Sequence, residues 1–81
     1  MQVTVHFYSY FKELAGTPQA ALDLPPQATL DFLRARILEQ FPRLAPMQKA
    51  MLAAVGVEYQ PWSFALSEGD EVSFFPPVQG G

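Results

Sequence analysis

Apolar residues occupy every second position in two segments of this 81-residue chain, residues 2–8 and residues 71–75. A period of two is typical of a strand that is buried on one face and open to solvent on the other. Both segments are therefore predicted strands. In the second one, Val72 and Phe74 are expected to face the core, which leaves Phe75 on the exposed face.

The middle of the chain has a helical period. Between residues 30 and 41, apolar side chains recur three and four positions apart, as they do on one face of an α-helix. Thr29 is a good N-cap, and Asp31 places a negative charge in the first turn, where the helix dipole favours it. Pro42 ends the pattern. One amphipathic helix is predicted over residues 30–41.

The remaining segments are shorter. Pro61 restricts its strand to an edge of the sheet, because proline cannot donate to a strand ladder. Gly56 marks a turn, which either glycine or asparagine could form with a positive φ. The pattern predicts helical turns at residues 10–15 and 46–50, strands at 19–24, 51–55 and 57–62, and a polar turn at 67–70.

This β-β-α-β-β-β order predicts an α+β fold, in which one main helix packs on a mixed sheet of about five strands. The first two strands are expected to form a hairpin, and the first and last to lie side by side in the centre. A hydrophobic content of 49% is enough for a single core at this length. We assign residues 1–75 to this domain and residues 76–81 to an extended, projecting C-terminal tail.

The tail has an unusual composition. Two prolines fix φ and remove backbone donors, so the chain is expected to leave the sheet after Phe75. The last two residues lack a Cβ atom and make the end of the backbone narrow. In a polyproline II conformation the six residues would reach roughly 18 Å. We expect the tail to insert into another protein. The inserted residues would be Pro76, Pro77, Val78, Gln79, Gly80 and the terminal Gly81.

Composition and charge argue against several classes of function. The formal net charge is −3, and the five Lys and Arg residues form no block, which argues against a nucleic-acid partner. The sequence has no cysteine, and its one histidine, His6, has no evident partner, so no metal site is expected. The apolar run at residues 50–57 is far shorter than the ~20 residues of a membrane span. We expect a cytoplasmic protein without a membrane partner.

Two common active-site motifs are absent from the sequence. It contains neither a G-x-x-x-x-G-K-[ST] phosphate loop nor a G-x-S-x-G nucleophile turn, so we expect this chain to bind no cofactor itself. By elimination, the catalytic group is the carboxylate of Gly81. A carboxylate is ionised at neutral pH and is a poor acyl donor until it is activated. An adenylating partner that uses ATP, followed by a sulfide donor, would convert it to a thiocarboxylate.

Aromatic residues are predicted near the base of the tail. Tyr8, Phe75 and Tyr59 are expected to face outward there, and buried aromatic anchors dominate the energy of many interfaces. Lys12 could present a cation to the same partner, although a solvated pair with Glu13 is the simpler interpretation. We therefore predict a partner interface at this end of the sheet.

Three segments carry a resemblance to a known family. They are Phe-Lys-Glu-Leu-Ala-Gly at residues 11–16, Leu-Ala-Ala-Val at 52–55, and the ending from Gly69 to Gly81. Together they resemble the small subunits of molybdopterin synthase, which have the ubiquitin-like β-grasp fold. The family often has asparagine where this chain has Gly56.

The resemblance implies a complete reaction cycle. A ubiquitin-activating-like adenylyltransferase would adenylate Gly81, and a sulfur donor would convert it to a thiocarboxylate. The tail would then enter the large subunit and give sulfur to cyclic pyranopterin monophosphate. The resemblance also implies a heterotetramer of two large and two small subunits, with Tyr8, Lys12, Tyr59 and Phe75 at or near the contact.

Other interpretations of the ending stay open. Sulfur carriers for thiazole synthesis or tRNA thiolation, and modifiers that conjugate to lysines, share a Gly-Gly terminus. A non-catalytic β-grasp interaction module with an idle tail is the alternative from a different class, because a fold alone does not define a function.

Overall fold

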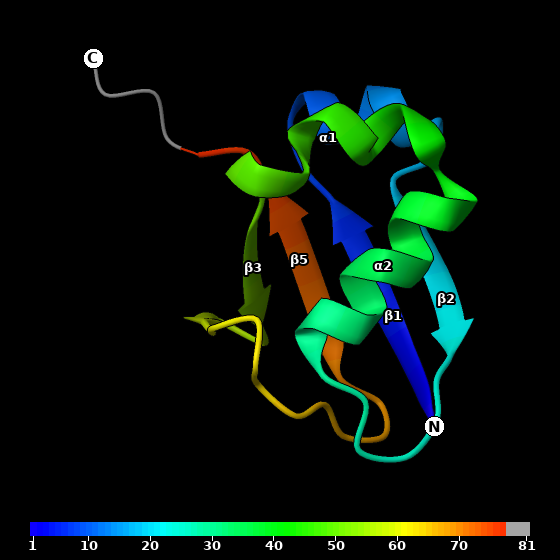
Figure 1. The fold of residues 1–81 in the computed structure, drawn as a ribbon, viewed down its shortest axis with the longest axis vertical. Coiled ribbons are helices and arrows are strands. Elements are labelled where there is room, and N and C mark those ends of the chain that lie inside the picture. The colour runs from blue at the N-terminus through cyan, green and yellow to red at the C-terminus, as the bar shows by residue number, and fades with distance from the viewer. Residues whose placement is uncertain (78–81) are drawn as a thin grey trace.

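The computed structural model describes residues 1–77, which form one sheet with a long helix packed across it (Figure 1). Within these residues the strands are β1 (Gln2–Phe7), β2 (Gln19–Asp23), β3 (Leu52–Val55), β4 (Glu58–Tyr59) and β5 (Glu71–Phe75). The helices are α1 (Tyr10–Ala15), α2 (Leu30–Gln40) and a 3-10 helix, η1 (Pro42–Ala50).

The sheet has the strand order β2-β1-β5-β3-β4. β1 and β5 are parallel neighbours in its centre, with Val5 paired to Val72 and Phe7 to Phe74. The other pairings, β1 with β2, β5 with β3, and β3 with β4, are antiparallel. The predicted central pairing of the first and last strands is therefore confirmed, as is the mixed character of the sheet. The antiparallel β1–β2 pair is also confirmed, with α1 in its connection.

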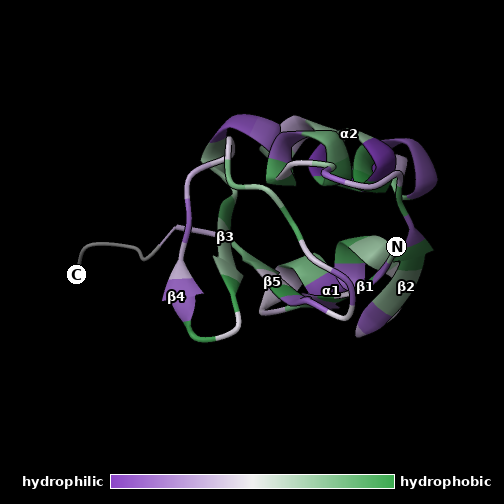
Figure 2. Ribbon diagram, turned by 90° about the horizontal axis from the view of Figure 1, so that it is seen from below, coloured by the Kyte–Doolittle hydropathy of each residue, from purple (hydrophilic) through white to green (hydrophobic). Residues whose placement is uncertain are grey.

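Helix α2 begins and ends close to the predicted positions. The hydroxyl oxygen of Thr29 accepts a hydrogen bond from the backbone N–H of Phe32 at 3.2 Å, which confirms the predicted N-cap. At the other end, the N–H of Phe41 donates to the carbonyl oxygen of Ile37 at 2.8 Å, and Pro42 follows. The helix covers one face of the sheet and leaves the opposite face without a helix (Figure 2).

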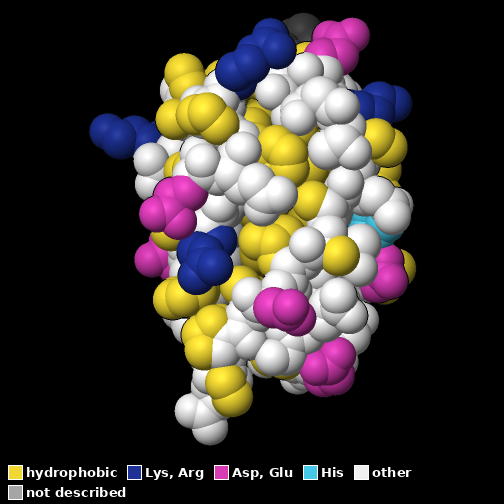
Figure 3. Space-filling view, turned by 90° about the vertical axis from the view of Figure 1, so that its right-hand side faces the viewer, with side chains coloured by type: hydrophobic (Ala, Val, Ile, Leu, Met, Phe, Trp, Pro, Cys, Tyr) yellow, Lys and Arg dark blue, Asp and Glu magenta, His cyan; other side chains and the backbone are white. Residues whose placement is uncertain are grey.

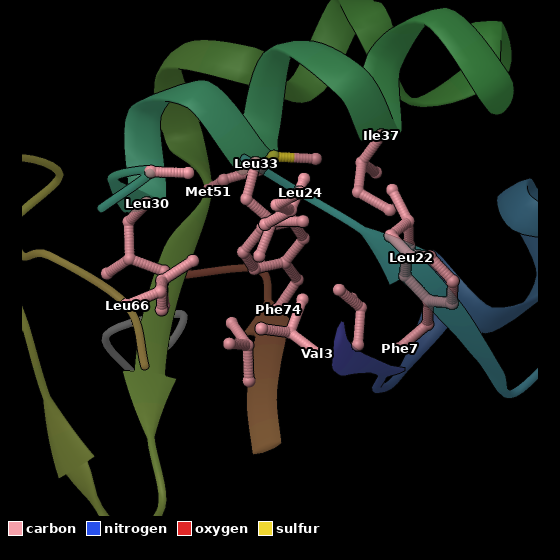
Figure 4. Close-up of a cluster of buried hydrophobic side chains, with 14 of the residues drawn as sticks. Val3, Phe7, Leu22, Leu24, Leu30, Leu33, Ile37, Met51, Leu66 and Phe74 are labelled. Carbon is pink, nitrogen blue, oxygen red and sulfur yellow. The ribbon is translucent and has the colours of Figure 1, made fainter. Parts of the chain in front are cut away.

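The core lies between α2 and the sheet face that it covers (Figure 4). Phe74 projects from β5 toward α2 and is fully buried, as is Val72 on the same strand. Phe11 from α1 and Leu44 from η1 add two further buried side chains. The largest fully buried side chains are Phe11, Phe74, Leu30, Leu33, Ile37, Leu44, Val3, Val5 and Val72. The inward orientation predicted for β5 is thus confirmed.

Two segments differ from the prediction. The helical turn expected at residues 46–50 is a nine-residue 3-10 helix, η1, which begins at Pro42 and contains Pro46. In an α-helix the proline ring would clash with the carbonyl group four residues earlier, which favours the 3-10 geometry here. The strand expected at residues 57–62 is the two-residue β4: Gly56 turns the chain before it with a φ of 61°, and Pro61 cannot donate to a strand ladder after it. The predicted positive φ at this glycine is confirmed.

Candidate functional site

The face of the sheet opposite α2, which we call the outer face, carries Tyr59 and Phe75, two of the side chains predicted to contact a partner. Cross-strand partners lie on the same face of a sheet, so the register identifies its members. One row runs from His6 through Ser73 and Ala54 to Tyr59. Leu52 is the partner of Phe75 in the next row.

Tyr59 and Phe75 form the centre of an apolar patch on this face. Their ring centroids are 5.3 Å apart with an interplanar angle of 65°, an edge-to-face arrangement. Tyr59 is 63% exposed, whereas Phe75 is half-buried. The prediction that Phe75 is exposed was therefore only partly correct, because its side chain is on the outer face but half-buried. Its ring lies against the tyrosine of β4, a contact that the alternation within β5 alone could not indicate.

Two members of the patch were missed by the sequence analysis. Leu52 is half-buried and Ala54 is buried, and both belong to the outer face because they pair with residues of that face on β5. The sequence pattern predicts a strand at residues 51–55 but does not assign its faces. Its uniformly apolar composition gives no alternation, so the register is needed to separate the two sides. We call Leu52, Ala54, Tyr59 and Phe75 the apolar patch.

Tyr8 lies directly after β1, at the end of the sheet where β5 also finishes. Its backbone N–H donates to the carbonyl oxygen of Phe74 at 3.1 Å, and the residue is 51% exposed. Lys12 is exposed on α1, and no ion pair joins it to Glu13 in the part of the chain that the structure describes. The structure places both residues near the end of β5, and their contact with a partner stays a prediction.

His6 has a partner that the sequence analysis did not find. Its Nε2 atom lies 2.6 Å from Oε1 of Glu71 on the neighbouring strand, because β1 and β5 are parallel and Thr4 pairs with that glutamate. The two residues are 65 positions apart in sequence. Nothing local could therefore have indicated the pair.

The tail begins where the central strand β5 ends. Pro76 is half-buried and Pro77 is exposed, and neither belongs to a strand, as predicted for two residues that lack a backbone donor. Val78, Gln79, Gly80 and the proposed reactive residue Gly81 lie outside the described residues, and their roles stay predictions.

Residues 1–77 contain no pocket and no group of three or more potential metal ligands. None of the helices in this part of the chain has the length and apolar character needed to cross a membrane.

A mixed five-stranded sheet with one helix across it, and a C-terminus that leaves its central strand, defines a β-grasp protein of the ubiquitin-like class. The chain belongs to the ThiS family, whose model matches residues 5–81. It is 39% identical to the molybdopterin synthase sulfur carrier subunit of Escherichia coli, over 98% of this chain and 99% of that protein.

Two solved structures show the same fold. Small archaeal modifier protein 1 of Haloferax volcanii is 21% identical, with a TM-score of 0.90 over the full length of both chains. A chain in the complex of subunits 1 and 2 of molybdopterin-converting factor from Helicobacter pylori is 26% identical, with a TM-score of 0.72 over the full length of both chains. The β-grasp fold expected from the sequence is thereby confirmed.

Proposed function

We propose that this protein is the sulfur-carrier small subunit of a molybdopterin synthase. The observation that carries the proposal is the position of β5, which leads from the sheet centre through Pro76 and Pro77 into a Gly-Gly end. The full-length similarity to the carrier subunit of Escherichia coli supports the choice of pathway. We place the protein in the cytoplasm and propose that it binds no cofactor of its own.

The chemistry follows from the terminal carboxylate. In an adenylating partner, a carboxylate oxygen of Gly81 attacks the α-phosphorus of ATP and displaces pyrophosphate. Sulfide from a donor then attacks the carbonyl carbon of the acyl-adenylate, and AMP leaves, which yields the thiocarboxylate. The absence of a side chain on Gly80 and Gly81 keeps the approach to this carbonyl open.

The second half-reaction takes place in the large subunit. There the thiocarboxylate sulfur attacks a side-chain carbon of cyclic pyranopterin monophosphate, and the carbon–oxygen bond at that carbon breaks, with its electron pair leaving on the oxygen. Water then hydrolyses the acyl–sulfur bond. This hydrolysis restores the Gly81 carboxylate for another cycle. The large subunit supplies the pocket for the phosphorylated pterin, and two small subunits bind two large ones in the heterotetramer.

The apolar patch provides the contact with the large subunit. Its aromatic members, Tyr59 and Phe75, have the size and rigidity of typical interface anchors, and Tyr8 and Lys12 lie at the same end of the sheet. The patch adjoins Pro76, so a protein that covers it also receives the tail. The Helicobacter pylori structure, described as a complex of subunits 1 and 2, supports such a contact.

A gene-deletion experiment separates this function from its alternatives. In the organism that encodes this chain, loss of the gene should reduce molybdopterin to background and cause cyclic pyranopterin monophosphate to accumulate. Wild-type protein should restore the cofactor, and a variant without Gly81 should not. Intact molybdopterin with a loss of thiamin synthesis, tRNA thiolation or lysine conjugates would assign the protein to one of those pathways instead. No change in any of these readouts would favour an interaction module.

A further inference from the structure

The basic residues of this protein are unevenly placed. The chain has five Lys and Arg residues, and they all belong to the helices α1, α2 and η1 rather than to the strands. Two of the five, Arg34 and Arg36, are on α2. The other three are exposed and lie on the two shorter helices: Lys12 on α1, with Arg43 and Lys49 on η1.

The two arginines of α2 have partners within the protein. The guanidinium of Arg34 is 2.7 Å from Oδ1 of Asp31 and lies 4.0 Å from the ring centroid of Trp62, which fixes it against the loop after β4. Arg36 lies over the ring of Phe32 at 5.9 Å and is 3.9 Å from a carboxylate oxygen of Glu39. By contrast, no ion pair or cation–π contact within residues 1–77 involves Lys12, Arg43 or Lys49.

These three cations share one end of the sheet. β1 and β5 are parallel and finish at this end, while the antiparallel β3 begins there, with Leu52 paired to Phe75. α1 follows β1, η1 precedes β3, and the tail follows β5, so all three segments meet at what we call the tail end (Figure 1). Contact between α1 and η1 confirms their proximity. Two acidic residues also belong to segments that reach this end, Glu13 on α1 and Glu39 in the last turn of α2.

The opposite end, which we call the far end, is acidic. It holds the start of β5, the turn before it, the end of β2, the β3–β4 turn and the start of α2. The amino group of Met1 lies here and donates to the Leu24 carbonyl oxygen. Arg34 on α2 lies between the two ends, because its Nη1 atom donates to the carbonyl oxygen of Gln48 on η1 at 3.3 Å. In Figure 3, most Lys and Arg side chains lie in the upper half, toward the tail end, and most acidic ones in the lower half. The far-end acids are Asp23, Asp31, Glu58, Glu68, Asp70 and Glu71.

Several far-end acids have structural roles. A carboxylate oxygen of Glu68 accepts from the N–H of Gln2 at 3.0 Å, and one of Asp70 accepts from the N–H of Ser67 at 2.8 Å. These hydrogen bonds within the fold explain why the two carboxylates lie where they do. Contacts with Asp31 and Trp62 explain the position of Arg34 in the same way. Within residues 1–77, no ion pair, side-chain hydrogen bond or cation–π contact accounts for the three tail-end cations, which leaves them available to another molecule.

We infer that Lys12, Arg43 and Lys49 form a cationic rim that docks on an acidic protein surface around the pocket that receives the tail. This inference rests on the proposed function and specifies the charge of the partner surface. The same rim serves the adenylating enzyme and the large subunit, because both must receive the same tail. The acidic far end is repelled by such a surface, so encounters with the wrong end forward are disfavoured.

The charge separation is large enough to act in solution. The two ends are separated by about the length of β1, ~20 Å for six residues, which is roughly two Debye lengths at 0.1 M ionic strength. A partner surface at one end therefore responds mainly to the charges of that end. Steering of this kind raises association rates by about 10–10³-fold at low salt and disappears when salt screens it.

Two variants with equal charge changes test the rim. Lys49→Glu alters the rim and Arg36→Glu alters α2, and each makes the net charge more negative by the same amount. We would measure association with the isolated large subunit and with the adenylating enzyme by stopped flow, at low and high salt. Lys49→Glu should slow association about tenfold at low salt, whereas Arg36→Glu should change it less than about twofold. Lys49→Arg keeps the positive charge and should therefore associate at the wild-type rate. High salt should abolish the differences among the variants.

The outcomes separate this inference from the proposed function. Equal effects of the two reversals, a salt-independent wild-type rate, or faster association of Lys49→Glu would overturn the acidic-surface inference while sulfur transfer continued. If wild-type protein bound neither partner at any salt concentration, the proposed function and the rim would both be wrong. Circular dichroism melting of each variant checks that the fold is unchanged.

Discussion

Removal of Gly81 is expected to reduce sulfur loading by about 10²-fold or more without unfolding the domain. Activation requires a carboxylate oxygen within ~3–3.5 Å of the attacked phosphorus, and loss of one extended residue withdraws the terminus by ~3.3 Å. The buried core extends from Val3 to Phe74, so the deletion removes none of its contacts. Intact mass measured after incubation with ATP, the adenylating enzyme and sulfide would give the loading rate, and a thermal melt would give the stability.

An extended variant provides the matched control. One alanine added after Gly81 keeps every native residue but displaces the carboxylate by the same distance in the other direction. It should bind the large subunit normally and fail to load. Loading of the shortened protein at the wild-type rate would contradict the required reach. A large fall in its melting temperature would contradict a tail that projects from the domain.

Phe74→Ala is expected to lower the free energy of unfolding by about 3–5 kcal/mol. Phe74 is fully buried between β5 and α2, and truncation of its ring leaves a cavity that a close-packed core fills only in part. A domain of this size has little stability in reserve, so a loss of this magnitude would leave much of the protein unfolded. Urea denaturation followed by circular dichroism measures the effect.

The adjacent residue supplies the comparison for this substitution. Phe75 lies on the outer face and is half-buried against Tyr59, so Phe75→Ala should cost much less stability. It should instead weaken binding to the large subunit about tenfold or more, as truncation of an interface anchor does. Unchanged affinity would remove Phe75 from the proposed interface. A stability loss equal to that of Phe74→Ala would show that both faces of β5 serve the core.

The parts of the fold that were predicted correctly have strong local patterns. The alternation in β5 and the helical period and N-cap of α2 depend on residues close in sequence, and the structure confirms them. The short β4 was overestimated because the extent of its pairing depends on the turn at Gly56 and on the neighbouring strand. The length of η1 was underestimated because a proline inside a 3-10 helix resembles a helix breaker.

The candidate site was predictable to the same extent. The composition of the last residues predicts a terminal chemistry that stays a prediction, whereas the structure confirms that Phe75 lies on the outer face, as the parity of β5 indicated. The contact of Phe75 with Tyr59, the contribution of Leu52 and the pair between His6 and Glu71 all join separate strands. Such contacts depend on the register between strands, which no single segment encodes.

The most direct test of the central proposal is the intact mass of the protein through one complete cycle. After incubation with ATP, the adenylating enzyme and a sulfide source, we predict a mass gain equal to the replacement of one oxygen atom by one sulfur atom at Gly81. Addition of the large subunit and cyclic pyranopterin monophosphate should then return the original mass. A gain that persists in their presence, or no gain with any adenylating enzyme, would contradict a role as the sulfur carrier of molybdopterin synthase.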